Sequence, residues 1–205
     1  MDPRTLGATH LDALRETANI GAGHAATALS SLTGRRVMVS VPEVSIHPLE
    51  QVGGMLGDPG EVVSAVIVKV QGDITGRTLQ VFQGSTASKL VALLLNVRDP
   101  TFPDGFGALE RSAVKEIGNV LVGAYINALA EFTNMRVSMS VPGFAIDMAA
   151  PILMTSYLNF GSEDDFVLSI GTKLSVDDGE ELRAHFLLIP DDDSLTRILR
   201  ALRVA

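Results

Sequence analysis

The chain has 205 residues, of which 46% are hydrophobic and 20% are charged, so it can bury a sizeable core in one large domain or two small ones. Acidic residues outnumber basic residues by 24 to 16, which gives a formal net charge of −8. This balance argues against nucleic acid as a partner, because phosphate binding needs a basic surface. No cysteine is present, which excludes disulfides, thiolate metal sites and cysteine nucleophiles.

The amino-terminal stretch MDPRTLGATHLDALRE carries early acids and no continuous apolar core, so it does not predict a secretory segment. No apolar run reaches the ~20 residues that a membrane helix needs. With the lack of cysteine, these features predict a cytoplasmic protein without a membrane partner.

The first predicted element is a helix whose apolar residues recur at spacings of three, four and seven, forming one stripe: Leu11, Leu14, Ala18, Ala25, Leu29 and Leu32. Gly34 is placed to end this helix in the left-handed conformation. The valine-rich residues 36–48 predict a β segment, and Pro42 within it indicates an edge strand or a bulge.

After a glycine-rich loop, residues 61–72 and 75–84 predict two strands joined by a turn. Residues 85–97 predict a second helix, with Ser85 as its N-cap. The next ten residues, with their prolines and glycines, indicate a linker.

The same order then restarts with a long helix over residues 107–133, whose apolar stripe is Val114, Ile117, Leu121, Tyr125, Ala128 and Phe132. A β segment over residues 135–144 and strands over residues 164–174 and 182–190 follow, and residues 191–204 predict a closing helix. The arginines of that helix suit its carboxyl end, where they complement the helix dipole; a docking stripe is the alternative: Arg197, Arg200 and Arg203.

An internal repeat relates the two halves at a constant offset of one hundred residues. ANIGAGHAATALSSLTGRRVMVSVP corresponds to GNVLVGAYINALAEFTNMRVSMSVP without a gap. The repeat predicts an α+β fold in a single domain over residues 1–205. Two pseudo-twofold related helix-strand-strand-strand-helix units, about 10–98 and 107–204, would share an antiparallel sheet packed with long helices.

Polar residues recur in the same register on both long helices: Asp12, Glu16 and Asn19 in the first, and Ser112, Glu116 and Asn119 in the second. Residues three and four apart share one helix face, so each set lines a single polar edge. An N-cap, a solvated Glu and an exposed Asn, copied by duplication, are the structural alternative. The repeat also pairs Gly23 with Gly123, which suggests close helix packing at both positions.

The spacing of Glu and Asn is weak evidence by itself, because Glu131 and Asn134 share it at a helix end without the preceding Asp or Ser. The run NIGAG lies inside the first predicted helix, follows no strand and lacks the Lys-Ser/Thr of a nucleotide-binding loop. The histidines show no metal-ligand spacing, so no metal site is predicted: His10, His24, His47 and His185.

ETANIGAGHAATALSSLTG with VPEV, then SAVKEIGNVLVGAYINALAEFT with VPGFAIDMAAPIL, resemble the CheC family over nearly the whole chain. That family comprises phosphatases of the phosphorylated chemotaxis regulator CheY and is related to CheX and FliY. The sequence departs from the usual pattern at Thr17 and Ala18, where the family often has Ile and Gly, and at His24, where it often has Asn.

The resemblance implies that Asn19 or Asn119 enters the active site of a CheY-type regulator and holds the attacking water, while Glu16 or Glu116 pairs with the regulator's lysine. The Mg²⁺ would belong to the regulator, so no cofactor of this chain's own is implied. The resemblance also implies a surface for the deamidase CheD at Asp147, for which an ordinary solvated acid at a helix start is the alternative reading.

The rival function is a non-enzymatic module that binds a regulator or CheD in the chemotaxis and flagellar switch system, since FliM-like switch proteins resemble this fold without the Glu/Asn pairs. Two intact pairs favour the enzyme, and they favour CheC over the single-site CheX. FliY-like proteins carry extra segments of which these 205 residues show none.

Overall fold

Five helices and seven strands follow one another along the part of the chain that the computed structural model describes, which is residues 8–202 without 49–50, 53, 55, 57, 59, 158–165, 178 and 192. In chain order they are α1 (Ala8–Thr33), β1 (Val37–Pro48), β2 (Val62–Gly72), β3 (Gly76–Gln83), α2 (Gly84–Leu95), α3 (Ala108–Thr133), β4 (Val137–Met139), β5 (Gly143–Met148), α4 (Ala149–Tyr157), β6 (Phe166–Val176), β7 (Leu182–Pro190) and α5 (Ser194–Ala201).

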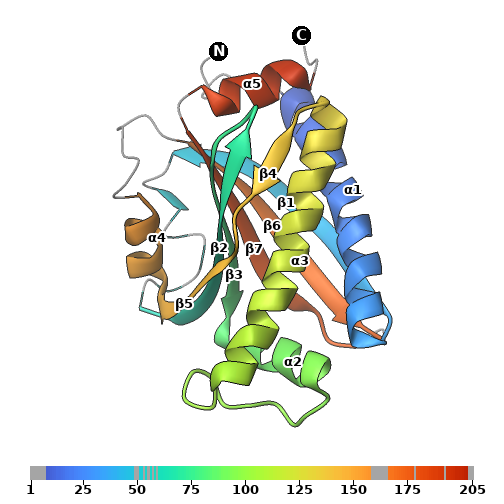
Figure 1. Ribbon diagram of the computed structural model, residues 1–205, viewed down its shortest axis with the longest axis vertical. Helices are drawn as coiled ribbons and strands as arrows, with labels where there is room; N and C mark the ends of the chain where they lie inside the picture. The colour runs from blue at the N-terminus through green and yellow to red at the C-terminus, as the bar shows by residue number, and fades with distance from the viewer. Residues whose placement is uncertain are drawn as a thin grey trace.

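The strands form one antiparallel sheet in the order β1-β6-β7-β3-β2-β4, with β5 also paired to β2 (Figure 1). The first strand of each half therefore pairs with the second strand of the other half: β1 with β6, and β4 and β5 with β2. The third strands, β3 and β7, pair at the centre. The predicted α+β fold in one domain is confirmed, and this exchange of strands interlocks its two pseudo-twofold related units.

Two aspartates lock the exchanged strands in the same way. The N–H of Asp177 donates to the carbonyl of Arg36 at 2.9 Å, and its carboxylate accepts the N–H of Arg36 at 3.1 Å. At the other end, the N–H of Asp73 donates to the carbonyl of Arg136 at 2.9 Å, and its carboxylate accepts the N–H of Arg136 at 2.7 Å. Each pair joins the loop after a long helix to the hairpin turn of the other unit.

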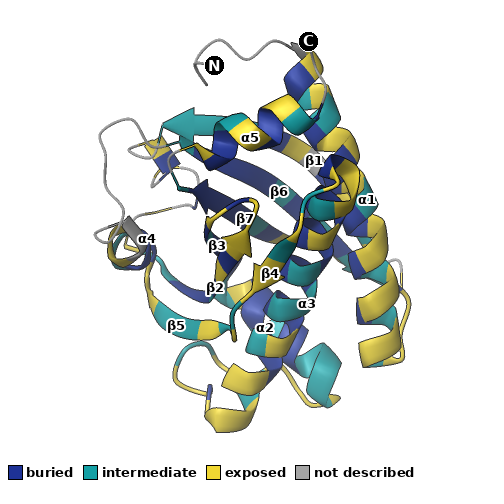
Figure 2. Cartoon of the chain, turned by 45° about the horizontal axis from the view of Figure 1, so that its top comes forward, coloured by how far each residue is buried: buried dark blue, intermediate teal, exposed yellow. Residues whose placement is uncertain are grey.

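α1 and α3 lie side by side and antiparallel on one face of the sheet (Figure 1). α5 packs at the end near the start of α1, and α2 packs at the end near the start of α3. α4 covers part of the opposite face, in a separate apolar cluster with Val52 and Leu56. The buried sides of the long helices face the sheet and their exposed sides face outwards (Figure 2).

The two long helices come closest where Gly21 of α1 meets Tyr125 of α3. A Cβ added at Gly21 would lie 2.8 Å from Cδ1 and 3.1 Å from Cα of Tyr125. Burial raises the pKa of the Tyr125 hydroxyl to about 12, although its 2.8 Å hydrogen bond with Thr172 acts in the other direction. The prediction that Gly23 and Gly123 mediate close helix packing is wrong, because neither would bring a Cβ within 3.4 Å of another group.

The β1 strand confirms the reading of Pro42: it is an edge strand, and its register with β6 shifts between Ser40 and Glu43. The left-handed residue after α1 is also confirmed, since Gly34 has φ +67°. The prediction of Ser85 as an N-cap is wrong: α2 already begins at Gly84, so Ser85 lies in its first turn.

The single β segment predicted over residues 135–144 is in fact two short strands, β4 and β5, that both pair with β2. The last helix is shorter than predicted and ends at Ala201, so Arg200 alone lies in its last turn. Arg197 instead donates to the carbonyl of Asp73 at 3.2 Å, which ties α5 to the β2–β3 turn. Arg203 lies outside the described residues.

Replacing Gly21 by alanine should destabilise the fold by about 1–3 kcal/mol, because the new methyl group meets the backbone of Tyr125 where the helices cannot separate freely. Denaturant unfolding of the Gly21→Ala variant measures this. Unchanged stability would show that α1 and α3 can move apart at no cost.

The Asp177→Asn variant should be less stable than wild type at neutral pH and equally stable at low pH. The hydrogen bond from Arg35, with the N–H and charge of Arg36, holds the pKa of the exposed Asp177 carboxyl below its usual value. A lowered pKa in the folded state contributes stability that is present above the unfolded pKa of about 4 and is lost as the pH falls through the folded pKa. Melting temperatures recorded from pH 7 to pH 3 test this.

The matched control is Asp99→Asn, which changes an exposed acid for which the described residues provide no ion pair. A difference in melting temperature between wild type and Asp177→Asn that stayed constant across the pH range would contradict the charge-based explanation.

Candidate functional site

The first candidate site lies on the outer face of α1. At 100° per residue, Asp12, Glu16 and Asn19 fall within about 60° of the helix circumference. All three side chains are exposed. They point outwards because Leu14 and Ala18, on the inner face, are only 2% and 3% exposed in the core against the sheet.

The second candidate site repeats this arrangement on α3. Ser112 and Glu116 are exposed, and Asn119 is half-buried. Ile117 and Gly118 face inwards, where a Cβ on Gly118 would lie 2.5 Å from Cγ2 of Val66 in the sheet. Because residue 118 has no side chain, the amino-terminal half of α3 can lie close to the sheet. The polar edge of α3 then faces away from the sheet.

None of the four Glu and Asn side chains makes a hydrogen bond or an ion pair with the described residues. In the first site Asp12 is engaged on its own helix, where its Oδ1 lies 3.7 Å from Nη1 of Arg15. Glu16 and Asn19 therefore remain available to an external partner, as do Glu116 and Asn119.

The two sites are separate. Asn19 lies two residues before Gly21, and Asn119 lies six residues before Tyr125, the residue that Gly21 contacts. Because the helices are antiparallel, these eight residues of rise place the two asparagines about 12 Å apart along the helix axes. They cannot act together on one reacting group.

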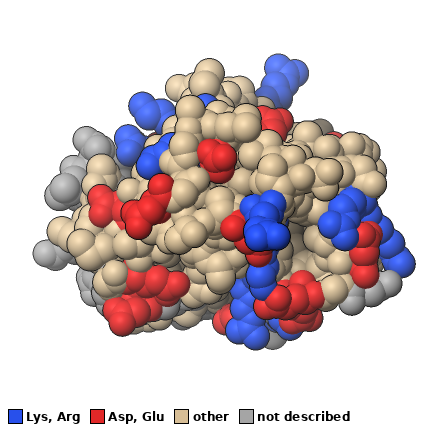
Figure 3. Space-filling view, turned by 90° about the horizontal axis from the view of Figure 1, so that it is seen from below, with Lys and Arg blue, Asp and Glu red and all other residues tan. Residues whose placement is uncertain are grey.

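The charges around these helices do not form a field of one sign. Figure 3 shows acidic and basic side chains interspersed at the end of the molecule that carries α2. Ion pairs within the described structure join Lys89 to Glu180, and Lys173 to Glu181 at 2.9 Å. The face seen there offers no continuous basic surface of the kind that nucleic acid needs.

No three His, Asp or Glu side chains in the described part of the chain lie close enough together to hold a metal ion. Burial lowers the pKa of His185, with Glu43 opposing this effect, and His10 is buried at the start of α1. Among the described residues, no helix combines the length and apolar character that crossing a membrane requires.

Comparison with known proteins matches these same helices. The CheC-like family matches residues 10–46 and 109–146, which contain both Glu/Asn pairs and the strand that follows each long helix. The chain is 28% identical over 194 residues to the CheY-P phosphatase CheC of Bacillus subtilis, covering 94% of this chain and 93% of that protein. Both halves of the chain are therefore similar to the CheC-like family.

Solved structures share the fold of this chain. A crystal structure of Thermotoga maritima FliY matches with a TM-score of 0.79 at 19% identity, covering 97% of this chain and 98% of that chain. CheX in its complex with CheY, BeF₃ and Mg²⁺ from Borrelia burgdorferi matches with a TM-score of 0.50 at 16% identity, covering 84% and 96%. At these identities the likeness concerns the fold alone.

Asp147 lies in β5 and is exposed, and its carboxylate accepts the N–H of Met148 at 2.8 Å. The helix α4 begins two residues later, at Ala149. This position suits a solvated acid near a helix start as well as a contact for CheD, so the CheD contact stays a prediction.

Sequence reasoning did not find Met139 beside the second site. Its Cε would lie 3.8 Å from a Cβ added at Gly123, one turn beyond Asn119, and the residue is 37% exposed. The repeat could not reveal this neighbour, because it follows from how β4 packs against α3.

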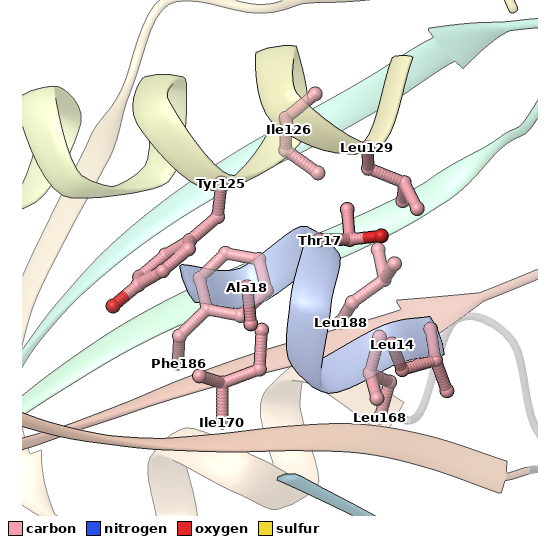
Figure 4. Close-up of a pocket in the computed structure, with 10 residues that line it drawn as sticks. All are labelled: Leu14, Thr17, Ala18, Tyr125, Ile126, Leu129, Leu168, Ile170, Phe186 and Leu188. Carbon is pink, nitrogen blue, oxygen red and sulfur yellow. The ribbon is translucent and has the colours of Figure 1, made fainter. Parts of the chain in front are cut away.

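Two of the departures from the usual CheC-like pattern line a small cavity between α1, α3 and the sheet (Figure 4). Thr17 and Ala18 lie at its wall together with apolar side chains: Leu14, Tyr125, Ile126, Leu129, Leu168, Ile170, Phe186 and Leu188. The hydroxyl of Thr17 donates to the carbonyl of Ala13 at 2.9 Å, so it does not need a partner in the cavity. With about 20 Å³, the space could hold little more than a methyl group or one water.

Thr17→Ile should stabilise the fold by up to about 1 kcal/mol, because it extends an apolar side chain at the wall of the cavity and removes a hydroxyl. Thermal unfolding measures the gain. The more conservative Thr17→Val serves as the control, since it removes the hydroxyl without extending the side chain. A loss of stability on Thr17→Ile alone would show that the cavity cannot accept the extra group.

Proposed function

We propose that this protein hydrolyses the aspartyl phosphate of a CheY-type response regulator and so ends the regulator's signal. The observation that carries this proposal is the pair of Glu/Asn sites, each on the outer face of a long helix and without a partner among the described residues; Glu16, Asn19 and Glu116 are exposed and Asn119 is half-buried. The B. subtilis relative, a CheY-P phosphatase, supports the same class of reaction.

Asn19 and Asn119 position the attacking water in this proposal. A carboxamide has both donor and acceptor groups, so it can hold a water molecule in one orientation. It is a poor base, but the leaving group is the regulator's aspartate, whose ordinary pKa is about 3.9. With so good a leaving group, in-line alignment of the nucleophile contributes more than proton removal.

The reaction consumes one water and needs no group from this chain to form a covalent bond. The water oxygen bonds to phosphorus while the bond between phosphorus and the aspartyl oxygen breaks. The regulator recovers its carboxylate, and the two water protons leave with inorganic phosphate. Mg²⁺ and the phosphoryl group would come with the regulator, since this chain supplies only alignment.

Glu16 and Glu116 set the register of docking. A carboxylate pairs well with a lysine ammonium, and such a pair fixes orientation as well as adding affinity. The Glu and the Asn are three residues apart, so they lie about 4.5 Å from each other along the helix axis, slightly less than one turn. A lysine beside the regulator's phosphoryl group can therefore meet the Glu while the Asn reaches the water.

Asn19→Ala and Asn119→Ala should each silence one site, and the double variant should lose about 10²-fold or more of the dephosphorylation rate, because the water is no longer aligned. Phosphate release from a CheY-type regulator, charged with a small-molecule phosphodonor and Mg²⁺, measures the rate. Asn127→Ala is the matched control, since Asn127 is an exposed asparagine further along α3.

A double variant as fast as wild type would refute the positioning role. Normal regulator binding by the wild-type chain with no faster phosphate release would instead favour the non-enzymatic binding module. Unchanged unfolding of the variants distinguishes a loss of chemistry from a loss of fold, because neither asparagine contributes a side-chain bond within the described structure.

A further inference from the structure

Gly23 and Gly123 are glycines for which the fold provides no packing reason. A Cβ added at Gly23 would meet no atom within 4 Å, and one at Gly123 would meet only Met139 Cε, at an ordinary contact distance of 3.8 Å. Gly21 and Gly118, on the same two helices, would instead place a Cβ at 2.8 Å and 2.5 Å from their neighbours. No contact within the molecule therefore requires glycine at position 23 or position 123.

Glycine in a helix interior is also unfavourable by itself, because it loses more backbone freedom on folding than alanine does. Neither Gly23 nor Gly123 has a left-handed φ, and α1 and α3 continue unbroken through them. Neither a turn nor a helix end explains them.

Duplication alone does not explain the match either. Around Gly23 the repeat has diverged: Gly21 corresponds to Leu121, Ala22 to Val122 and His24 to Ala124. Gly23 itself is matched by Gly123. The identity has survived at this position while its neighbours changed according to what each packs against.

The position of these glycines on the helix indicates their purpose. Each follows the site asparagine by four residues, and at 100° per residue it falls within the same 60° sector as the Glu and the Asn. One turn beyond Asn19 and Asn119 the helix itself thus presents no side chain, although Met139 of β4 borders the second position.

We propose that Gly23 and Gly123 keep this surface bare so that the docked response regulator can pack directly on the helix backbone beside the catalytic asparagine. The inference rests on the proposed function and names two further positioning residues for it. A side chain at either place would lift the regulator from the helix and move the asparagine out of line with phosphorus. Displacements of about 1 Å suffice to slow such reactions strongly.

The test isolates one site at a time. In an Asn119→Ala background only the first site works, and Gly23 is replaced there by alanine and by leucine. Because the space at Gly23 is open and both are good helix formers, both variants should melt at or above the temperature of their parent. Dephosphorylation measured by kcat/KM should nevertheless fall about tenfold for alanine and further for leucine.

The binding arm uses the same variants with a regulator carrying BeF₃ and Mg²⁺ as a stable phosphoryl mimic. The Kd should weaken in the order Gly, Ala, Leu. In the second site, Gly123→Ala in an Asn19→Ala background should show the same loss. Ala28→Leu is the control for an added apolar group, since Ala28 is exposed on α1 and lies outside the 60° sector.

The outcomes separate the two proposals. If the asparagine variants lose activity while the glycine series keeps both kcat/KM and Kd, the proposed function stands and this inference is overturned. If the wild-type chain binds the mimic without hydrolysing phosphate, the enzyme is overturned, and the Kd series still decides whether the bare surface is the contact. Absence of both binding and hydrolysis overturns both. A fall in melting temperature for Gly23→Ala would also overturn the inference, because it would reveal a structural role.

Discussion

The exchange of first strands between the two halves is the constraint on which the rest of the structure depends. Because β1 pairs with β6, and β4 and β5 pair with β2, neither half can complete its part of the sheet without the other. Hydrogen bonds from the main chain of Arg36 to Asp177, and from that of Arg136 to Asp73, hold the two exchanged strands in place. Both connections use the main-chain N–H and carbonyl of the arginine, a pair of bonds that any residue except proline could make.

The exchange also decides where the two long helices lie. Each long helix leads directly into an exchanged edge strand, so α1 and α3 are brought together, antiparallel, on one face of the sheet. Their contact at Gly21 and Tyr125 then fixes their relative height. The outer edges of both helices face solvent as a result, and the Glu/Asn pairs occupy them at two independent places.

Much of this could be predicted from the sequence, because periodicity and the hundred-residue offset report on single elements and on their duplication. What could not be predicted depends on distant partners. Val41 and Val141 are identical in the repeat, yet one is 7% exposed and the other 87%, because β1 continues through its bulge while the equivalent strand breaks between β4 and β5. Helix packing was assigned to Gly23 and Gly123 for the same reason: the sequence shows a repeated glycine but not what lies opposite it. The roles of the Glu and Asn residues and the boundaries of the two units stay predictions.

On both long helices the residues that pack against the sheet differ from those that face solvent in how well the repeat has kept them. Their inner faces have diverged, with Thr17 and Ala18 bordering a cavity in one and Ile117 and Gly118 packed closely in the other. Their outer faces have kept Glu, Asn and Gly in one register. An inner residue has to fit a local core that differs between the halves, so Gly21 corresponds to Leu121 and Ala25 to Tyr125. Under the proposed function an outer residue at both sites fits the same partner, which is a physical reason for Glu, Asn and Gly to repeat in register where these inner positions do not.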